Sequence, residues 1–256
     1  MHDKLWIGTS WKMNKTRADA RVFAGTLARS SLINDARAQP FVIPPLTSVS
    51  VVADLLAGTR VRVGAQNMHW ADAGAWTGEV SPPMLLDAGA TLVEIGHSER
   101  RTNFGETDET VALKVAAAVR HGLTPLVCIG DTRAEYDAGQ TAEVLARQVA
   151  AALSRIAPGD GGAEMLIAYE PVWSIGEGGT PAEPAFVEAQ HVRIKQLTEA
   201  KLGRALPVLY GGSVNPDNCV ALAARPSIDG LFIGRSAWAV EGYLGILSLV
   251  LTSLAA

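Results

Sequence analysis

Eight short apolar runs, separated by stretches with helical spacing, are the feature that most constrains the fold of this chain. Strands buried on both faces read as continuous apolar runs, and the helices between them then cover a parallel sheet. Eight such units in 256 residues suit a closed barrel better than an open sheet. We therefore predict an α/β fold, a single (β/α)8 barrel. The expected strands are Leu5–Gly8, Phe41–Ile43, Val61–Ala65, Leu92–Ile95, Pro125–Ile129, Met165–Tyr169, Val208–Tyr210 and Gly230–Ile233.

The stretches between these runs predict helices and give no sign of a domain boundary. No linker, charge block or low-complexity segment interrupts the alternation, so we expect residues 1–256 to form one domain. The clearest helical segments are Thr16–Leu27, Ser48–Leu56, Glu109–Val119 and Thr141–Ile156.

Composition and the chain ends narrow the class of protein. The net charge is -4, so the chain lacks the excess of positive charge that is typical of proteins that bind nucleic acid. The N-terminus lacks the apolar run of a signal peptide, and the C-terminal apolar stretch is shorter than the roughly 20 residues that span a bilayer. The two cysteines, Cys128 and Cys219, are too few for a disulfide framework, and their spacing is not that of metal ligands. We predict a cytoplasmic protein with no metal, no cofactor and no membrane partner.

Polar residues just after the strands of such a barrel form its active face. This chain places a cation, an imidazole, a carboxylate and glycine-rich loops there. The residues concerned are Ser10, Lys12, Gln66, Asn67, His97, Ser98, Glu99, Gly130, Asp131, Glu170, Gly211, Gly212, Ser213, Gly234 and Arg235.

Glu170 follows the sixth expected strand directly, and Pro171 ends that strand because proline has no N–H to give to a sheet. A carboxylate at a strand end, beside a glycine-rich loop that can close over a ligand, is suited to act as a general base. A glutamate that caps a helix or pairs with a cation fits the same stretch equally well.

His97 stands between a strand and a polar helix start, where the helix N-terminus lowers the pKa of a nearby imidazole. A neutral histidine can then polarise a carbonyl group, although a structural hydrogen bond at the strand end also explains the residue. Lys12 follows the first strand, and a solvated surface lysine is its alternative interpretation.

Glycine-rich loops follow the seventh and eighth strands, where barrels frequently bind phosphate through backbone N–H groups. They contain Gly211, Gly212 and Ser213 after one strand, and Gly234 and Arg235 after the other. Either loop alone is also explained as a tight turn from strand to helix, but the pair favours a phosphate site.

Seven segments together resemble the motifs of triosephosphate isomerase, in that family's order and over nearly the whole chain. This resemblance implies the TIM barrel fold and an isomerase. The segments are Gly8-Thr9-Ser10-Trp11-Lys12-Met13-Asn14, Gly64-Ala65-Gln66-Asn67, Gly78-Glu79-Val80-Ser81-Pro82, Gly96-His97-Ser98-Glu99-Arg100-Arg101, Cys128-Ile129-Gly130, Tyr169-Glu170-Pro171-Val172-Trp173 and Tyr210-Gly211-Gly212-Ser213-Val214.

The resemblance implies a role for each candidate residue. Glu170 would be the base that moves a proton between adjacent carbons, and His97 the neutral electrophile, a pairing taken from this family itself. Lys12 would be a fixed positive charge for the phosphate and the enediolate. An enediol phosphate loses its phosphate in water, so the site must close.

The family likeness also implies the binding and supporting residues. Residues 174–180 would be the lid, and Glu99 would position Lys12 or the helix start, with Ser98 beside it as a further supporting residue. The phosphate would be held by Gly176, Ser213, Gly234 and Arg235.

Three departures from the family pattern bear on the substrate. Ser10 replaces the usual asparagine, Arg235 replaces a second glycine, and the lid segment Ile175–Pro181 lacks the usual lysine and alanine. Serine is smaller than asparagine, so Ser10 would leave room beside the reacting carbons for one more hydroxymethyl group and still offer a hydroxyl. Each change alone is also explained by neutral drift. The combination of GTSWKMNK, the IGEGG lid and IGRSAW near the eighth strand resembles the L-erythrulose-1-phosphate isomerase branch, which makes D-erythrulose 4-phosphate in tetritol catabolism.

Two other functions fit parts of this pattern. Ordinary triosephosphate isomerase, acting on D-glyceraldehyde 3-phosphate and dihydroxyacetone phosphate, tolerates the same catalytic residues. A catalytically silent phosphosugar-binding protein would have lost a proton-transfer group, whereas Lys12, His97 and Glu170 are all present.

The segment Ala73–Glu79 resembles the loop by which this family docks into a second subunit. It carries Trp76, a large aromatic side chain that is rarely left solvated without a partner. A homodimer through the loop around Trp76-Glu79 is the expectation, and a loop folded back on its own barrel is the alternative.

Overall fold

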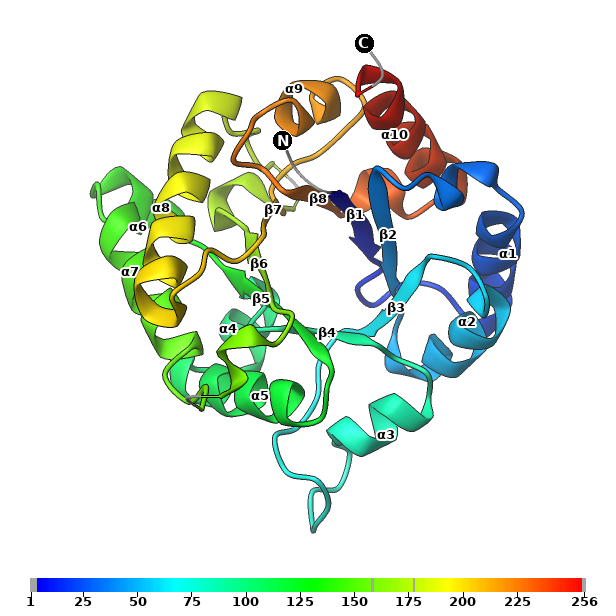
Figure 1. The fold of residues 1–256 in the computed structure, drawn as a ribbon, viewed down its shortest axis with the longest axis horizontal. Helices are drawn as coiled ribbons and strands as arrows, with labels where there is room; N and C mark the ends of the chain where they lie inside the picture. The colour runs from blue at the N-terminus through cyan, green and yellow to red at the C-terminus, as the bar shows by residue number, and fades with distance from the viewer. Residues whose placement is uncertain (1–3, 158, 177, 255–256) are drawn as a thin grey trace.

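The first and last strands of the chain pair with each other, and this closes a barrel of eight parallel strands (Figure 1). The structure is a computed structural model that describes residues 4–157, 159–176 and 178–254. Each strand pairs with the next one along the chain, and Thr9 lies opposite Ile233 at the closing seam. The strands are β1 (Leu5–Ser10), β2 (Ala38–Ile43), β3 (Arg62–Ala65), β4 (Leu92–Ile95), β5 (Thr124–Ile129), β6 (Leu166–Tyr169), β7 (Val208–Tyr210) and β8 (Gly230–Ile233).

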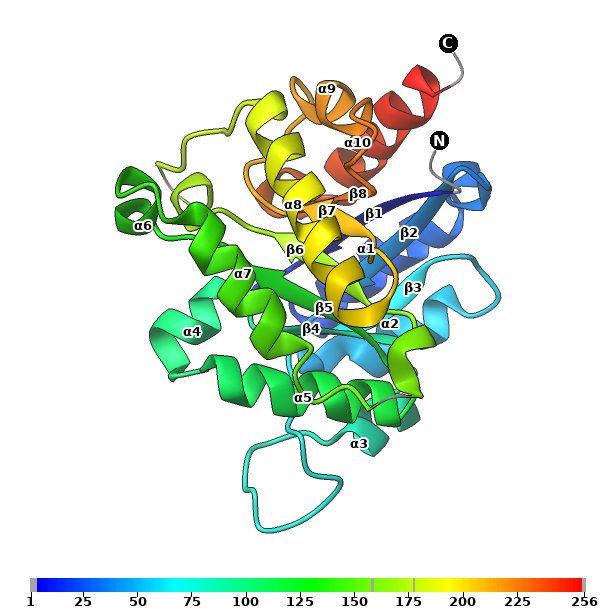
Figure 2. The same cartoon turned by 60° about the vertical axis from the view of Figure 1, so that its left-hand side comes forward.

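Helices surround the strands on the outside, and their apolar faces pack against the barrel wall (Figures 1 and 2). Short 3-10 turns join some of these elements. The α-helices are α1 (Arg17–Ala28), α2 (Val49–Leu56), α3 (Pro82–Asp87), α4 (Ser98–Phe104), α5 (Asp108–Arg120), α6 (Arg133–Asp137), α7 (Thr141–Ala152), α8 (Pro184–Leu202), α9 (Cys219–Ala223) and α10 (Val240–Ser253). The 3-10 helices are η1 (Ser31–Asn34), η2 (Leu46–Ser48), η3 (Asp160–Gly162), η4 (Val172–Ser174) and η5 (Arg235–Ala237).

The predicted barrel is confirmed, and its strands fall at the predicted apolar runs, although β2 begins at Ala38 rather than at Phe41. β1 is longer than expected and continues to Ser10, because Thr9 and Ser10 still pair with Val42 and Ile43 of β2. The helix expected at 141–156 ends earlier, at Ala152. Both cysteines are free and buried. The chain termini 1–3 and 255–256 of the expected domain lie outside the described residues.

Alternate residues of each strand point into the barrel, as the two-residue repeat of a strand requires. The inward set forms a compact apolar cluster that fills the barrel, and the outward set packs under the helices. The inward cluster is Trp6, Phe41, Ile43, Leu92, Leu126, Cys128, Leu166, Ala168, Leu209 and Phe232.

The segment between β3 and α3 projects from the barrel as a long loop (Figures 1 and 2). Trp76 within it is 50% exposed. Its ring packs against His69, with ring centroids 4.3 Å apart, so the aromatic anchor of this loop is ordered by its own chain. None of the helices in the described part of the chain has the length and apolarity needed to cross a membrane.

Candidate active site

A pocket of about 260 Å³ opens at the carboxyl ends of the strands. All eight residues predicted to be catalytic or to bind substrate line it. Of the two predicted supporting residues, Glu99 lines a neighbouring hollow together with Lys12, and Ser98 lines another hollow beside Cys128. The eight are Ser10, Lys12, His97, Glu170, Gly176, Ser213, Gly234 and Arg235.

Glu170 is held just beyond the end of β6 by close backbone contacts. Its N–H donates to the carbonyl of Ile129 at 2.7 Å. A Cβ atom at Gly130 would lie 1.9 Å from the Glu170 carbonyl oxygen, and one at Gly211 would lie 2.7 Å from Glu170 Cγ. These two glycines therefore make room for Glu170 itself, a role beyond the phosphate approach expected of Gly211.

The Glu170 carboxyl group is poised to accept a proton. The residue is 3% exposed, and its Oε2 has no hydrogen-bond partner among the described residues. Burial, followed by the charge of Glu94, raises the pKa of Glu170 to about 8. A buried carboxylate with a raised pKa and an unpartnered oxygen is a stronger base than a solvated one.

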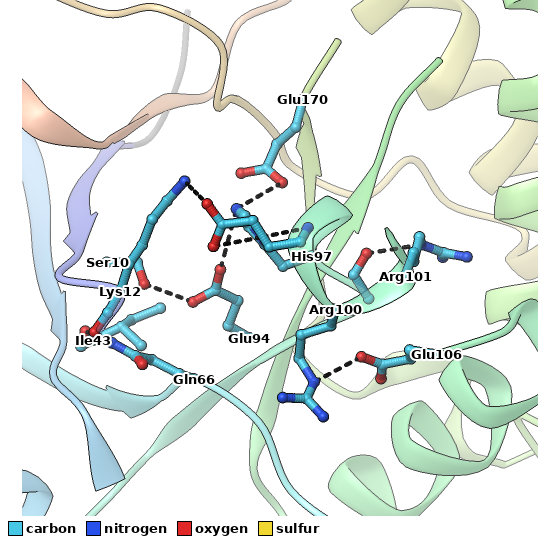
Figure 3. Close-up of polar contacts among 12 residues, drawn as sticks. Ser10, Lys12, Ile43, Gln66, Glu94, His97, Arg100, Arg101, Glu106 and Glu170 are labelled. Carbon is cyan, nitrogen blue, oxygen red and sulfur yellow. Dashed lines mark hydrogen bonds and ion pairs between the residues drawn. The ribbon is translucent and has the colours of Figure 1, made fainter. Parts of the chain in front are cut away.

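His97 is the N-cap of α4, and the helix start fixes its tautomer. Nδ1 accepts a hydrogen bond from the Glu99 backbone N–H at 3.1 Å, so the proton of the neutral ring is on Nε2. Nε2 faces Glu170 Oε2 at 3.7 Å and Glu94 Oε1 at 4.0 Å (Figure 3). Burial, then the charge of Lys12, lowers the pKa of His97 to about 4. The sequence pointed to the helix N-terminus as the cause, whereas burial is the larger one.

Lys12 is held in a left-handed backbone conformation, with φ 51°. A non-glycine residue rarely adopts it, and roughly 1 kcal/mol of strain has to be offset by its contacts. Gln66 Nε2 donates to the Lys12 carbonyl oxygen at 2.9 Å, and Lys12 Nζ donates to Glu99 Oε1 at 2.8 Å. The Glu99 carboxylate thus orients the ammonium group at the pocket mouth.

The far end of the pocket is formed by the loops after β6, β7 and β8. The Ser213 N–H, expected to bind phosphate, donates to Ser174 Oγ at 3.2 Å. The same oxygen lies 3.1 Å from the Tyr210 hydroxyl. Gly176 has φ 82°, which glycine adopts without strain. Of the expected lid at 174–180, Glu177 lies outside the described residues.

Glu94 is the site residue that the sequence reasoning missed. It lies in β4, within an apolar run that predicts only a buried strand. It is 3% exposed, and its Oε2 accepts a hydrogen bond from Ser10 Oγ at 2.8 Å. Burial raises the pKa of Glu94 to about 7. The available signal was the lone charged residue in an otherwise apolar strand, one position before the end of the run.

Among the described residues no three His, Cys, Asp or Glu side chains are grouped so that they can hold a metal ion. The pocket offers instead a buried carboxyl group, a neutral imidazole and an ammonium group around one small volume. Such a set can take a proton from carbon and stabilise the negative charge that develops on oxygen.

The sequence model of one family, triosephosphate isomerase, matches residues 5–250. The chain belongs to the triosephosphate isomerase family. Membership makes this chain an isomerase of a phosphorylated sugar, in agreement with the sequence-based prediction.

Within this family the chain is similar to proteins named L-erythrulose-1-phosphate isomerase. The protein of that name from Rhizobium rhizogenes is 59% identical over 245 residues, which cover 96% of this chain and 94% of the relative. The one from Brucella abortus is 57% identical over 253 residues, 99% of both chains. The one from Mesorhizobium japonicum is 58% identical over 242 residues, 94% of this chain and 95% of the relative.

Proposed function

We propose that this enzyme interconverts L-erythrulose 1-phosphate and D-erythrulose 4-phosphate through an enediolate. The observation that carries the proposal is the name shared by relatives that are 57 to 59% identical over nearly the whole chain. The smaller Ser10 at the pocket wall supports it, because a four-carbon ketose needs more room than a triose at that position.

In the proposed mechanism Glu170 and His97 move two protons in parallel. The Glu170 carboxylate takes the proton from C3, and the C–H electrons form the C2–C3 double bond. His97 Nε2 carries the proton of the C3 hydroxyl to the oxygen on C2. Glu170 then returns its proton to C2 while the C3 oxygen becomes the new carbonyl, so both residues end as they began.

Lys12 stabilises the enediolate charge, which is worth most in a pocket sheltered from water. The main-chain groups of Gly176, Ser213 and Gly234, together with Arg235, hold the phosphate at the other end. Residues 174–180 close over it as a lid, and the Ser213 N–H exchanges Ser174 Oγ for a phosphate oxygen. Glu99 and Ser98 support the wall without touching the substrate.

Steady-state kinetics on purified enzyme test the proposal. We expect kcat/KM for L-erythrulose 1-phosphate to exceed that for D-glyceraldehyde 3-phosphate. The reverse order means that the enzyme is a triosephosphate isomerase. Turnover of neither substrate, with phosphosugar binding retained, means a binding protein.

We further propose that the enzyme is a cytoplasmic homodimer of one-domain subunits comprising residues 1–256. The projecting loop with Trp76 supports the dimer, as does a hollow of about 490 Å³ beside Lys12 and His97. Large exposed apolar side chains line that hollow, among them Met13 at 96% and Phe104 at 69% exposure, and a partner's loop would cover them. Gel filtration with light scattering should give twice the mass of the chain, and the variant Trp76→Ser should weaken the dimer.

A further inference from the structure

We propose that Glu94 determines substrate choice: its carboxyl group binds the hydroxyl of the terminal hydroxymethyl group that distinguishes a four-carbon ketose phosphate from a triose phosphate. The inference rests on the proposed function. It assigns a task to a buried carboxyl group that the mechanism above does not use.

The position of Glu94 in β4 turns its side chain toward the inside of the barrel. Leu92, two residues earlier, belongs to the inward cluster, whereas Val93 and Ile95 pack outward under the helices. Glu94 therefore lies in the uppermost inward layer, directly below the pocket, where Ser10 of β1 meets it. A charged residue in that layer is costly unless it has polar partners.

The carboxyl group has one oxygen engaged and one available. Oε2 accepts the hydrogen bond from Ser10 Oγ at 2.8 Å. Oε1 makes no hydrogen bond to any of the described residues, and it lies 4.0 Å from His97 Nε2, beyond hydrogen-bond length (Figure 3). Because the Ser10 proton is committed to Glu94, the two side chains form one polar unit rather than two independent groups.

Glu94 lies on the side of the reacting carbons that is opposite the phosphate end. The pocket of about 260 Å³ runs from Ser213 and Gly234 to His97, and the hollow of about 490 Å³ begins at His97 and reaches Glu94. Both are lined by Ser10 and His97. A substrate with its phosphate at Ser213 and its reacting carbons beside His97 therefore directs its next carbon toward the Ser10 and Glu94 pair.

A hydroxymethyl group suits this carboxyl group in either protonation state. A hydroxyl donates to the carboxylate and accepts from the neutral acid, and burial brings the pKa of Glu94 to about 7. A triose phosphate carries hydrogen in place of that group and leaves Oε1 unpaired. Sites that bind a substrate hydroxyl through buried polar groups discriminate against analogues that lack it for this reason.

The test compares kcat/KM for L-erythrulose 1-phosphate and D-glyceraldehyde 3-phosphate in the wild type and in two variants. Glu94→Leu removes the carboxyl group, and Glu94→Asp keeps the charge but withdraws it by one methylene. We expect the ratio of four-carbon to three-carbon kcat/KM to fall about 10- to 100-fold in Glu94→Leu, the range for one hydrogen bond to a charged group. It should also fall in Glu94→Asp.

The matched control is Asp229→Asn. Asp229 is a half-buried carboxyl group just before β8, at the end of the strands away from the pocket; it accepts from the Val208 N–H at 2.7 Å and lines neither hollow. The ratio should not change there. Thermal melts check folding, and if Glu94→Leu does not fold, the fall in Glu94→Asp carries the test.

The outcomes separate this inference from the proposed function. A wild type that prefers D-glyceraldehyde 3-phosphate overturns the proposed function, and the role of Glu94 with it. A wild type that prefers the four-carbon substrate, with the same ratio in both Glu94 variants, overturns the role of Glu94 alone. Equal loss on both substrates is the signature of a residue that only positions Ser10 or tunes Glu170.

Discussion

The free energy of unfolding of the Glu94→Gln variant, relative to that of the wild type, should be higher at pH 8 than at pH 5. Burial raises the pKa of Glu94 from 4.5 to about 7. Between these values the folded protein holds a proton that the unfolded chain has released, so the free energy of unfolding falls as pH rises. Each pKa unit is worth about 1.4 kcal/mol. The wild type should therefore lose between about 2 and 3 kcal/mol of stability at this residue between pH 5 and pH 8.

Glutamine does not titrate, has nearly the same size, and offers an oxygen that can accept from Ser10 Oγ. Urea unfolding of both proteins, at pH 5 and pH 8 and one protein concentration, gives the measurement. The variant should gain between about 2 and 3 kcal/mol on the wild type across this range. The titration of His97, present in both proteins, largely cancels in the difference, and the lower pKa of Glu170 in the variant adds to the gain in the same direction.

The control is Glu143→Gln, which removes an exposed carboxyl group of α7 and should give the same difference at both pH values. If the wild type and Glu94→Gln lose stability in parallel as pH rises, Glu94 titrates as a solvated residue. Burial would then not raise the pKa of Glu94.

Three further predictions concern Glu170 and its surroundings. Glu170→Asp should lower kcat about 100-fold or more with a modest change in KM, because it moves the base without removing it, and unchanged kcat would rule Glu170 out as the base. Gly211→Ala should lower kcat similarly, because the new Cβ would lie only 2.7 Å from Glu170 Cγ and would push that side chain away. A crystal structure of the variant would show the shift. The kcat/KM of the wild type should rise with pH to half its maximum near pH 8, where the free Glu170 ionises, and this midpoint should move to lower pH in Glu94→Gln. A midpoint unmoved by that substitution would show that the two carboxyl groups are not coupled.

The barrel could be predicted from the sequence because its strands are buried on both faces. An apolar run such as Leu92–Ile95 or Val208–Tyr210 then marks a strand almost residue for residue. Strand ends are less certain, as in β1, because pairing with a neighbour continues through polar residues such as Thr9. The predictions for residues 1–3, Glu177 and residues 255–256 stay predictions, because these residues lie outside the described part of the chain.

The sequence also allowed the prediction that the pocket residues lie close together, because the residues that follow parallel strands are all at the same end of the barrel. The sequence does not reveal what each side chain contacts there. Ser10 was expected to leave room and to offer a hydroxyl group to the substrate; it does line the pocket, but its hydroxyl group donates to Glu94, from a strand more than 80 residues away. How deeply a side chain is buried also depends on the assembled barrel. The residues next to His97 in the sequence therefore could not show that burial is the main cause of its low pKa.

The seam between β8 and β1 has a consequence for protein synthesis. Trp238 Nε1, just beyond β8, donates to the Ser10 carbonyl at 3.0 Å, across 228 residues of chain. At translation rates of about 5 to 20 residues per second, roughly 10 to 50 s pass between the emergence of these two partners. During that time β1 keeps an unpaired edge, which is prone to join other strands. The nascent chain therefore depends on its surroundings for protection, and its pocket is complete only after residues 230–238 have left the ribosome.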